Sequence, residues 1–396
     1  MVRDEARLAS IDAVRGVVMV VMALDHVRDF FHIGAMSAQP EDLATTTPLL
    51  FFTRWITHVC APAFVFLAGV AAERRLRRDG SPARLSRYLW TRGLWLVVIE
   101  ITVMRFAFNF RFQTQDLLML LVLSALGLSM VILAALVYLP APFVGALGIA
   151  VIVLHNLLDP IQARDLGLLA PAWTVLHEPG VFTMAGLPVL AGYPVLPWAG
   201  LMAVGFAAGG VFDLHPAKRR RVLAWTGTAL VVAFVAMRLM NQYGDPSPWA
   251  SQSSAVMTVL SFLRTTKYPP SLIFVLMTLG PVLLALAWFE RQTPDRSDPL
   301  VVIGRVPLFY YVGHFLLAHI TASLVVWWQY GDFALAFRSG PFPSMGGSRA
   351  AFPTDFGHPL WVTYVAWAGV VAVMYPLCRW YERQTRQGDR GWRRYL

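Results

Sequence analysis

Ionisable side chains interrupt the first apolar segment of the sequence, where a membrane core would disfavour them. This segment contains Asp12, Arg15, Asp25, His26 and His32. A charge at mid-bilayer costs about 2.5–3.5 kcal/mol on insertion scales, so such side chains normally face a bundle interior and have partners. On a helix, one stripe contains Asp12, Arg15, Met19, Met22 and His26, and it puts His26 about 21 Å beyond Asp12. The pattern predicts an ion pair at one end and an imidazole that could act as general base near the other; a structural ion pair and an interfacial histidine fit equally well.

The second apolar segment carries Arg54 and His58 four residues apart, on one helix face. Both are expected at the membrane depth of Asp25 and His26. A carboxylate such as Asp25 could fix the tautomer of a histidine base, and Arg54 could stabilise a developing oxyanion or bind an anionic substrate. The alternative is that Arg54 only extends toward the membrane interface.

Two further polar groups lie in the second half of the chain. Tyr311 and His314 form a polar spot inside an apolar segment, beside Gly313, whose small size would let another backbone approach. Lys267 and Tyr268 begin a stiff polar stretch before the next apolar segment. These residues are candidates for substrate or oxyanion binding; a helix-to-helix hydrogen bond and a solvated loop are the alternatives.

Arginines gather at the opposite ends of the apolar segments. Arg87, Arg92 and Arg305 could hold the phosphates of a cytosolic nucleotide carrier, because planar guanidinium groups suit phosphate. The alternative is that they only set the topology of the chain. The sequence has no P-loop, GxSxG, HExxH or CxxC motif, and its nine histidines lack local metal-ligand spacing, so no metal site is expected.

The composition indicates which elements position these residues. Of 396 residues, 57% are hydrophobic and 14% are charged, against about 25% charged in soluble proteins. We predict an all-α, polytopic integral membrane helical bundle that forms a single domain over residues 1–396. About ten spans are expected, near 11–31, 49–72, 88–109, 117–138, 142–158, 191–212, 221–240, 270–289, 300–328 and 359–380. The segment 159–190 could hold a partial eleventh span.

The distribution of basic residues predicts the orientation. Most arginines and lysines fall in loops on the side of the N-terminus, which the positive-inside rule places in the cytosol together with the C-terminus. The net charge of +10 is then explained by topology, and no nucleic-acid partner is expected. No cleavable signal peptide is visible. The long loops 33–48, 241–269 and 329–358 are expected on the outer face, and membrane lipids surround the bundle.

Three motifs resemble the membrane-embedded acyltransferase superfamily, which includes heparan-alpha-glucosaminide N-acetyltransferase and the sugar O-acyltransferases of the acyltransferase-3 type. They are Leu8-Ala-Ser-Ile-Asp-Ala-Val-Arg-Gly with His26 following, Pro62-Ala-Phe-Val-Phe-Leu-Ala-Gly, and Tyr311-Val-Gly-His. The first resembles the acyltransferase-3 start, and the third is similar to the heparan enzyme. Bacterial relatives of unknown function and of the same length are the most similar in pattern.

This resemblance implies transfer of an acyl group, usually acetyl, from cytosolic acyl-CoA to a saccharide or glycolipid beyond the membrane. A bacterial cytoplasmic (inner) membrane is the expected location. His26 matches the histidine regarded as catalytic in the acyltransferase-3 group. The heparan enzyme has Asn there and uses a histidine in the following loop, for which His32 is the nearest match, and His58 falls where that enzyme has Asp.

The resemblance and the residue pattern together assign roles along the path. Acyl-CoA phosphates would bind Arg92, Arg305 and Arg87, with Arg15 and Asp12 at the same end. Asp25 would orient the base His26, and the tetrahedral oxyanion would be stabilised by the side chains of Arg54, His58 or His314. An acyl-histidine intermediate and an assembly of two copies are left open. A transporter for a glycan or anionic solute is the rival class, because intramembrane charges and broken spans suit transport as well; a scaffold protein is the third.

Overall fold

The computed structural model describes residues 8–112, 117–337, 342–345 and 347–386. Parts of the predicted loop 329–358, and both chain ends, therefore lie outside the described residues. The chain is mostly helical, at 74%. The longer helices are α1 (Ala9–Phe31), α3 (Cys60–Asp79), α4 (Pro82–Ile99), α6 (Val122–Leu136), α7 (Ala141–Leu154), α9 (Val195–Ala208), α10 (Pro216–Met240), α12 (Leu272–Gln292), α14 (Pro307–Tyr330) and α16 (Leu360–Arg386). The shorter ones are α2 (Pro48–Trp55), α5 (Arg105–Asn109), α8 (Ala170–Leu176), α11 (Ala255–Leu263), α13 (Pro299–Arg305) and α15 (Phe333–Phe337).

Seven helical stretches of the described chain are long and apolar enough to cross a membrane. They are Pro48–Asp79, Ala141–Leu158, Val195–Asp213, Pro216–Met240, Leu272–Gln292, Pro307–Tyr330 and Leu360–Thr385. The predicted spans 11–31, 88–109 and 117–138 also form helices, but α1 is rich in charge and α6 has only 15 residues. A mostly helical bundle with seven candidate membrane spans is confirmed, whereas the count of ten spans and the orientation stay predictions.

The predicted span 300–328 is two helices rather than one. α13 ends at Arg305, Val306 leaves the helical conformation with φ −124° and ψ 52°, and Pro307 begins α14. Proline lacks an N–H and has a fixed φ, so it suits the first turn of a helix and favours a break before it. The break turns Arg305 away from the axis of α14 and places it at the end of α13.

The segment 159–190 is not a span, and the fold is not purely α-helical. It contains α8 and the hairpin of β2 (Gly180–Met184) and β3 (Leu187–Ala191), joined at Ala185 and Gly186, which both have positive φ. Two positive φ values are typical of the tight turn that hairpins prefer. β3 also pairs in parallel with β1 (Leu118–Leu120), in the order β1-β3-β2. The sequence left a partial span open because short apolar strands and a partial span have similar hydropathy.

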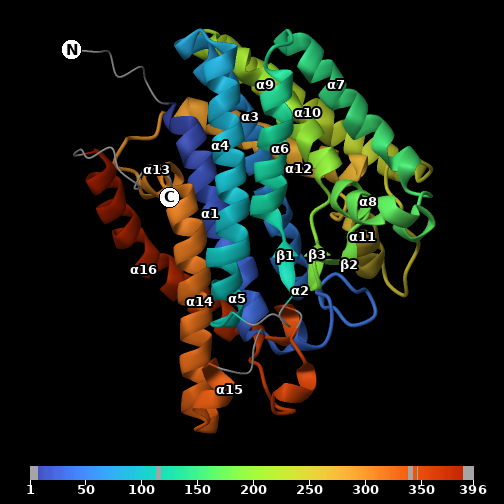
Figure 1. The fold of residues 1–396 in the computed structure, drawn as a ribbon, viewed down its shortest axis with the longest axis vertical. Helices are drawn as coiled ribbons and strands as arrows, with labels where there is room; N and C mark the ends of the chain where they lie inside the picture. The colour runs from blue at the N-terminus through green and yellow to red at the C-terminus, as the bar shows by residue number, and fades with distance from the viewer. Residues whose placement is uncertain (1–7, 113–116, 338–341, 346, 387–396) are drawn as a thin grey trace.

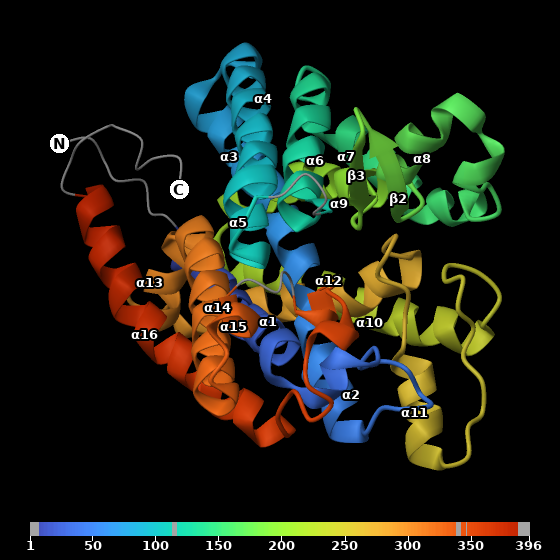
Figure 2. The ribbon, with the colours of Figure 1, turned by 60° about the horizontal axis from the view of Figure 1, so that its bottom comes forward.

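Helix α1 runs through the centre of the bundle and packs against α3, α12, α13, α14 and α16 (Figures 1 and 2). Its crossing with α13 depends on Gly16 and Gly304. A Cβ on Gly304 would overlap the carbonyl oxygen of Asp12, and one on Gly16 would overlap that of Leu300. Gly313, for which a close backbone was predicted, instead faces the Met374 side chain. Small residues thus bring α13 against the start of α1.

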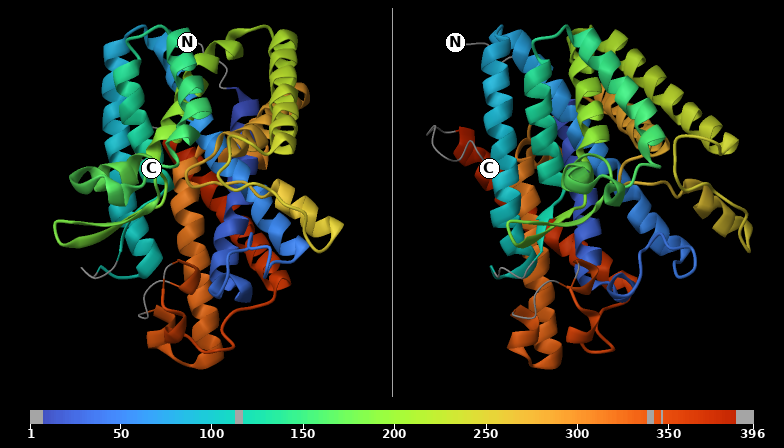
Figure 3. Two further views of the ribbon diagram at one scale, coloured as in Figure 1. Left: turned by 90° about the vertical axis from the view of Figure 1, so that its right-hand side faces the viewer. Right: turned by 45° about the vertical axis from the view of Figure 1, so that its right-hand side comes forward.

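The two ends of the bundle have different polar contacts. Arg305 contacts Asp12 near the start of α1, with 3.5 Å between Nε and Oδ2, and Glu382 in α16, with 2.8 Å between Nη1 and Oε1. We call this the Arg305 end. At the opposite, His32 end, the backbone of His32 pairs with that of His358, so the loop after α1 and the segment after α15 lie together (Figure 3).

Candidate active site

A cavity of about 360 Å³ lies beside α1, toward α3, α4, α6 and α14. Along α1 it is lined by four residues of the predicted stripe, Arg15, Met19, Met22 and His26, and by Asp25 beside them. Asp12, the remaining member, is buried and pairs with Arg15 at 3.6 Å between Oδ1 and Nη1. The helical periodicity of the sequence therefore located one wall of the cavity.

The cavity joins cationic side chains toward the Arg305 end to imidazole near the His32 end. Arg92 and Tyr88, one turn apart in α4, line it with Arg15. His26 and Lys267 line its other half. The rise of a helix puts the Cα of His26 about 16 Å beyond that of Arg15, so a long flexible ligand could touch both ends.

His26 is held by a hydrogen-bonded chain that crosses from α1 to α14. Its Nδ1 lies 2.8 Å from Nε2 of His314, and Nδ1 of His314 lies 2.7 Å from the Tyr310 carbonyl oxygen. A carbonyl can only accept, so His314 Nδ1 donates to it, and Nε2 of a neutral His314 is an acceptor. His26 then donates through Nδ1, which leaves its Nε2 with a lone pair. This tautomer is assigned from the hydrogen-bond chain, and it is the one that a general base requires.

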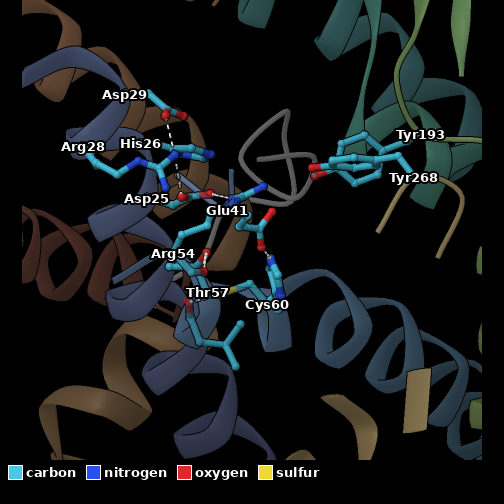
Figure 4. Close-up of polar contacts among 12 residues, drawn as sticks. Asp25, His26, Arg28, Asp29, Glu41, Arg54, Thr57, Cys60, Tyr193 and Tyr268 are labelled. Atoms are coloured by element: carbon cyan, nitrogen blue, oxygen red, sulfur yellow. Dashed lines mark hydrogen bonds and ion pairs between the residues drawn. The ribbon is translucent and has the colours of Figure 1, made fainter. Parts of the chain in front are cut away.

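Asp25 does not share this chain. Its carboxylate pairs with Arg54 and, at 3.0 Å, with Nη2 of Arg28, which also contacts Asp29 at 2.5 Å (Figure 4). Neighbouring positions on a helix point about 100° apart, so Asp25 reaches the arginines while His26 reaches α14. The structure thus pairs Asp25 with Arg54 and gives His26 a different partner, His314.

His58 and His32 lie outside the set of described residues that line the cavity. His58 is fully buried, with Nε2 2.6 Å from Oε1 of Glu41. Burial alone would raise the pKa of Glu41, but the adjacent His58, together with Arg54 and Lys267, outweighs burial and lowers that pKa to about 2. Glu41 therefore anchors its loop to His58 as a carboxylate. His32 occupies the backbone bridge to His358, where it contributes to loop structure.

The cation that lines the cavity near His26 is Lys267. The sequence pattern also allowed Arg54 at this position, but Arg54 is not among the described lining residues. Its Nζ lies 5.2 Å from the ring centroid of Tyr268, whose hydroxyl donates to that of Tyr193 at 3.0 Å (Figure 4). Tyr311 lines the cavity as well, with its ring edge-to-face against His26. The sequence analysis missed Tyr193, because no polar pattern in the neighbouring sequence distinguishes it.

The predicted phosphate-binding arginines separate into two groups. Arg92 and Arg15 line the cavity, whereas Arg87 is exposed and Arg305 belongs to the ion cluster with Asp12. Sequence reasoning missed Tyr88, although its spacing from Arg92 is the i,i+4 spacing of a shared helix face.

The sequence of the chain was also compared with known proteins and protein families. No curated protein matches the chain. Residues 7–243 match the family described as heparan-alpha-glucosaminide N-acetyltransferase, catalytic. The matched part contains His26, Arg54 and Arg92, whereas Lys267, Arg305 and His314 follow it. Because the match covers more than half of the 396 residues, the chain belongs to the heparan-alpha-glucosaminide N-acetyltransferase catalytic family and is a transmembrane acetyltransferase-like protein.

Proposed function

We propose that the chain transfers an acetyl group from cytosolic acetyl-CoA to a saccharide acceptor on the far side of a bacterial cytoplasmic membrane. The observation that carries the proposal is a single cavity lined by Arg92 at one end and by a base-ready His26 at the other. In this arrangement the Arg305 end faces the cytosol, both chain ends lie inside, and the chain crosses the membrane about ten times.

The donor is held by groups at the two ends of the cavity. Arg92 and Arg15 contact the phosphates of acetyl-CoA, and Tyr88 supplies an aromatic surface beside them. The pantetheine arm follows the methionine-lined wall of α1. The thioester then lies between His26 and Lys267.

The reaction needs one base and one oxyanion partner. Nε2 of His26 removes the proton from an acceptor hydroxyl or amine as the new bond to the acetyl carbonyl carbon forms. The ammonium of Lys267 stabilises the oxyanion of the tetrahedral intermediate. When the carbon–sulfur bond breaks, the thiolate of CoA leaves and takes the proton from His26. The protonated ring keeps its Nδ1–H hydrogen bond to His314 throughout.

The test uses the full chain in proteoliposomes, with acetyl-labelled acetyl-CoA outside and amino-sugar acceptors inside. We expect His26→Ala to lower labelled product by about 10²–10⁴-fold, the usual contribution of a general base. His358→Ala is the matched control, because His358 lies at the same end but outside the described cavity lining. Unchanged transfer by His26→Ala would remove His26 from the mechanism. Movement of an intact solute without acetylated product would favour a transporter.

A further inference from the structure

A second cluster of ionisable side chains lies outside the described cavity lining. His155 follows the end of α7, Asp159 comes one helical turn later, and His177 follows the end of α8. One ligand atom from each of the three lies within 4.8 Å of the other two. The chain segment between Asp159 and His177 folds back so that two helix ends meet here.

Both histidines of this cluster are buried without the hydrogen bonds such groups normally make. Each imidazole residue is 2% exposed, and in the described part of the chain neither ring nitrogen of either makes a hydrogen bond of normal geometry. The nearest charged group is Asp159, whose Oδ1 lies 3.2 Å from Nε2 of His177. Asp159 and the Pro270 carbonyl account for at most one nitrogen of each ring. An unsatisfied buried polar group costs about 1–3 kcal/mol, so the remaining nitrogens indicate an absent partner.

The surroundings resemble the second shell of a metal centre. Nδ2 of Asn156 donates to Oδ2 of Asp159 at 3.0 Å, and Oδ1 of Asn156 accepts from the backbone N–H of Leu272 at 3.0 Å. The Pro270 carbonyl lies beside the His155 ring. Carbonyls and amides that orient ligating side chains in this way are usual around bound metals. The two imidazole rings lie at 76° with centroids 5.6 Å apart, so they can direct nitrogens to one point without stacking.

We propose that His155, Asp159 and His177 bind one zinc ion, with water at the fourth position. Two imidazoles and a carboxylate suit zinc, whereas calcium and magnesium prefer all-oxygen ligands. The Asp159 side chain is 24% exposed while the histidines are buried, so the open position faces the Asp159 side. The ion links the end of α7 to the end of α8 and thereby holds the segment that leads into the β2–β3 hairpin. This structural role is independent of acyl transfer.

The experiment measures zinc on the full chain purified in detergent. The protein is stripped with a chelator, supplied with zinc chloride alone and dialysed, and its metal content is measured by mass spectrometry. We expect about one zinc ion per chain for the wild type and at least a ten-fold lower content for His177→Ala. His215→Ala is the matched control, because His215 is an exposed histidine before α10, at the other end of the bundle, and it should retain the wild-type content.

A second variant separates metal binding from failure to fold. Asp159→Asn keeps the size of a partly exposed side chain and removes the anionic ligand. We expect zinc to raise the melting temperature of the wild type but not of this variant. Asn156→Ala should weaken binding by about 10–100-fold, as loss of an outer-shell partner does. Equal zinc content in the wild type and in His177→Ala, or an equal rise in melting temperature in Asp159→Asn, would overturn the proposal.

Discussion

Nδ1 of His26 lies 2.8 Å from Nε2 of His314 and joins the central helix α1 to α14 across 288 positions of sequence. The contact determines which nitrogen of His26 keeps a lone pair, because His314 is itself oriented by the Tyr310 carbonyl. His314 is thus a positioning residue that acts through His26.

This relationship predicts that His314→Phe lowers kcat for acetyl transfer by about 10²-fold, a loss at the lower end of those for general bases, with little change in KM for acetyl-CoA. Without an acceptor at Nε2 of His314, the His26 ring loses its fixed tautomer. His314→Gln offers an amide oxygen to the same Nδ1–H and should recover part of the rate. Steady-state kinetics of both variants check this. If the two are equally impaired, the histidine has only a packing role.

Lys267 should contribute to the transition state rather than to donor binding. We expect Lys267→Met to lower kcat by about 10²–10³-fold, as removal of an oxyanion partner does, while Lys267→Arg keeps the charge and part of the rate. The comparison is Arg54→Lys, which preserves the cation that pairs with Asp25. This variant should be much milder, because Arg54 itself lies outside the described cavity lining. A larger kcat loss in Arg54→Lys than in Lys267→Met would transfer the oxyanion role to Arg54.

The sequence was most informative where one helix carries the pattern. The spacing of Arg15, Met19, Met22 and His26 predicts a shared face, and these residues line one wall of the cavity. The sequence does not show which distant segments of the chain contact each other. The local sequence marked Lys267 as a candidate binding residue but could not place it near His26, because its position depends on how the loop before α12 packs against the other helices.

The same limit explains what the sequence left open in the fold. Hydropathy recognises an apolar stretch but not its conformation, so it could neither distinguish the β-hairpin from a partial span nor locate the break within the predicted span 300–328. The prediction of no metal site relied on local spacing. The proposed zinc ligands His155 and His177 are far apart in the sequence and meet only in the fold, so a search for local spacing does not detect them.

Arg92 and Arg87 lie in the same helix but should differ in function. Arg92→Ala is expected to raise KM for acetyl-CoA by about 10–100-fold, because a hydrogen bond to a charged group contributes about 1.5–3 kcal/mol. kcat should change little, since the phosphates are remote from the reacting carbonyl. Arg87→Ala is the control, because its exposed side chain lies outside the described cavity lining. Equal KM values for the two variants would show that Arg92 does not bind the donor.

The crossing of α1 with α13 should tolerate no added methyl group. A Cβ on Gly304 would overlap the Asp12 carbonyl oxygen, so Gly304→Ala forces apart the two helices that bring Arg305 to Asp12. We expect a loss of about 1–3 kcal/mol in stability, typical of overpacking, measured as a lower thermal unfolding midpoint in detergent.

Gly369→Ala in α16 is the matched control, because a Cβ there has no described heavy atom within 4 Å. Alanine also favours a helix by about 1 kcal/mol over glycine, so this control should match or exceed the wild-type midpoint. If the unfolding midpoint of Gly304→Ala is as high as that of Gly369→Ala, the two helices can move apart without a measurable loss of stability.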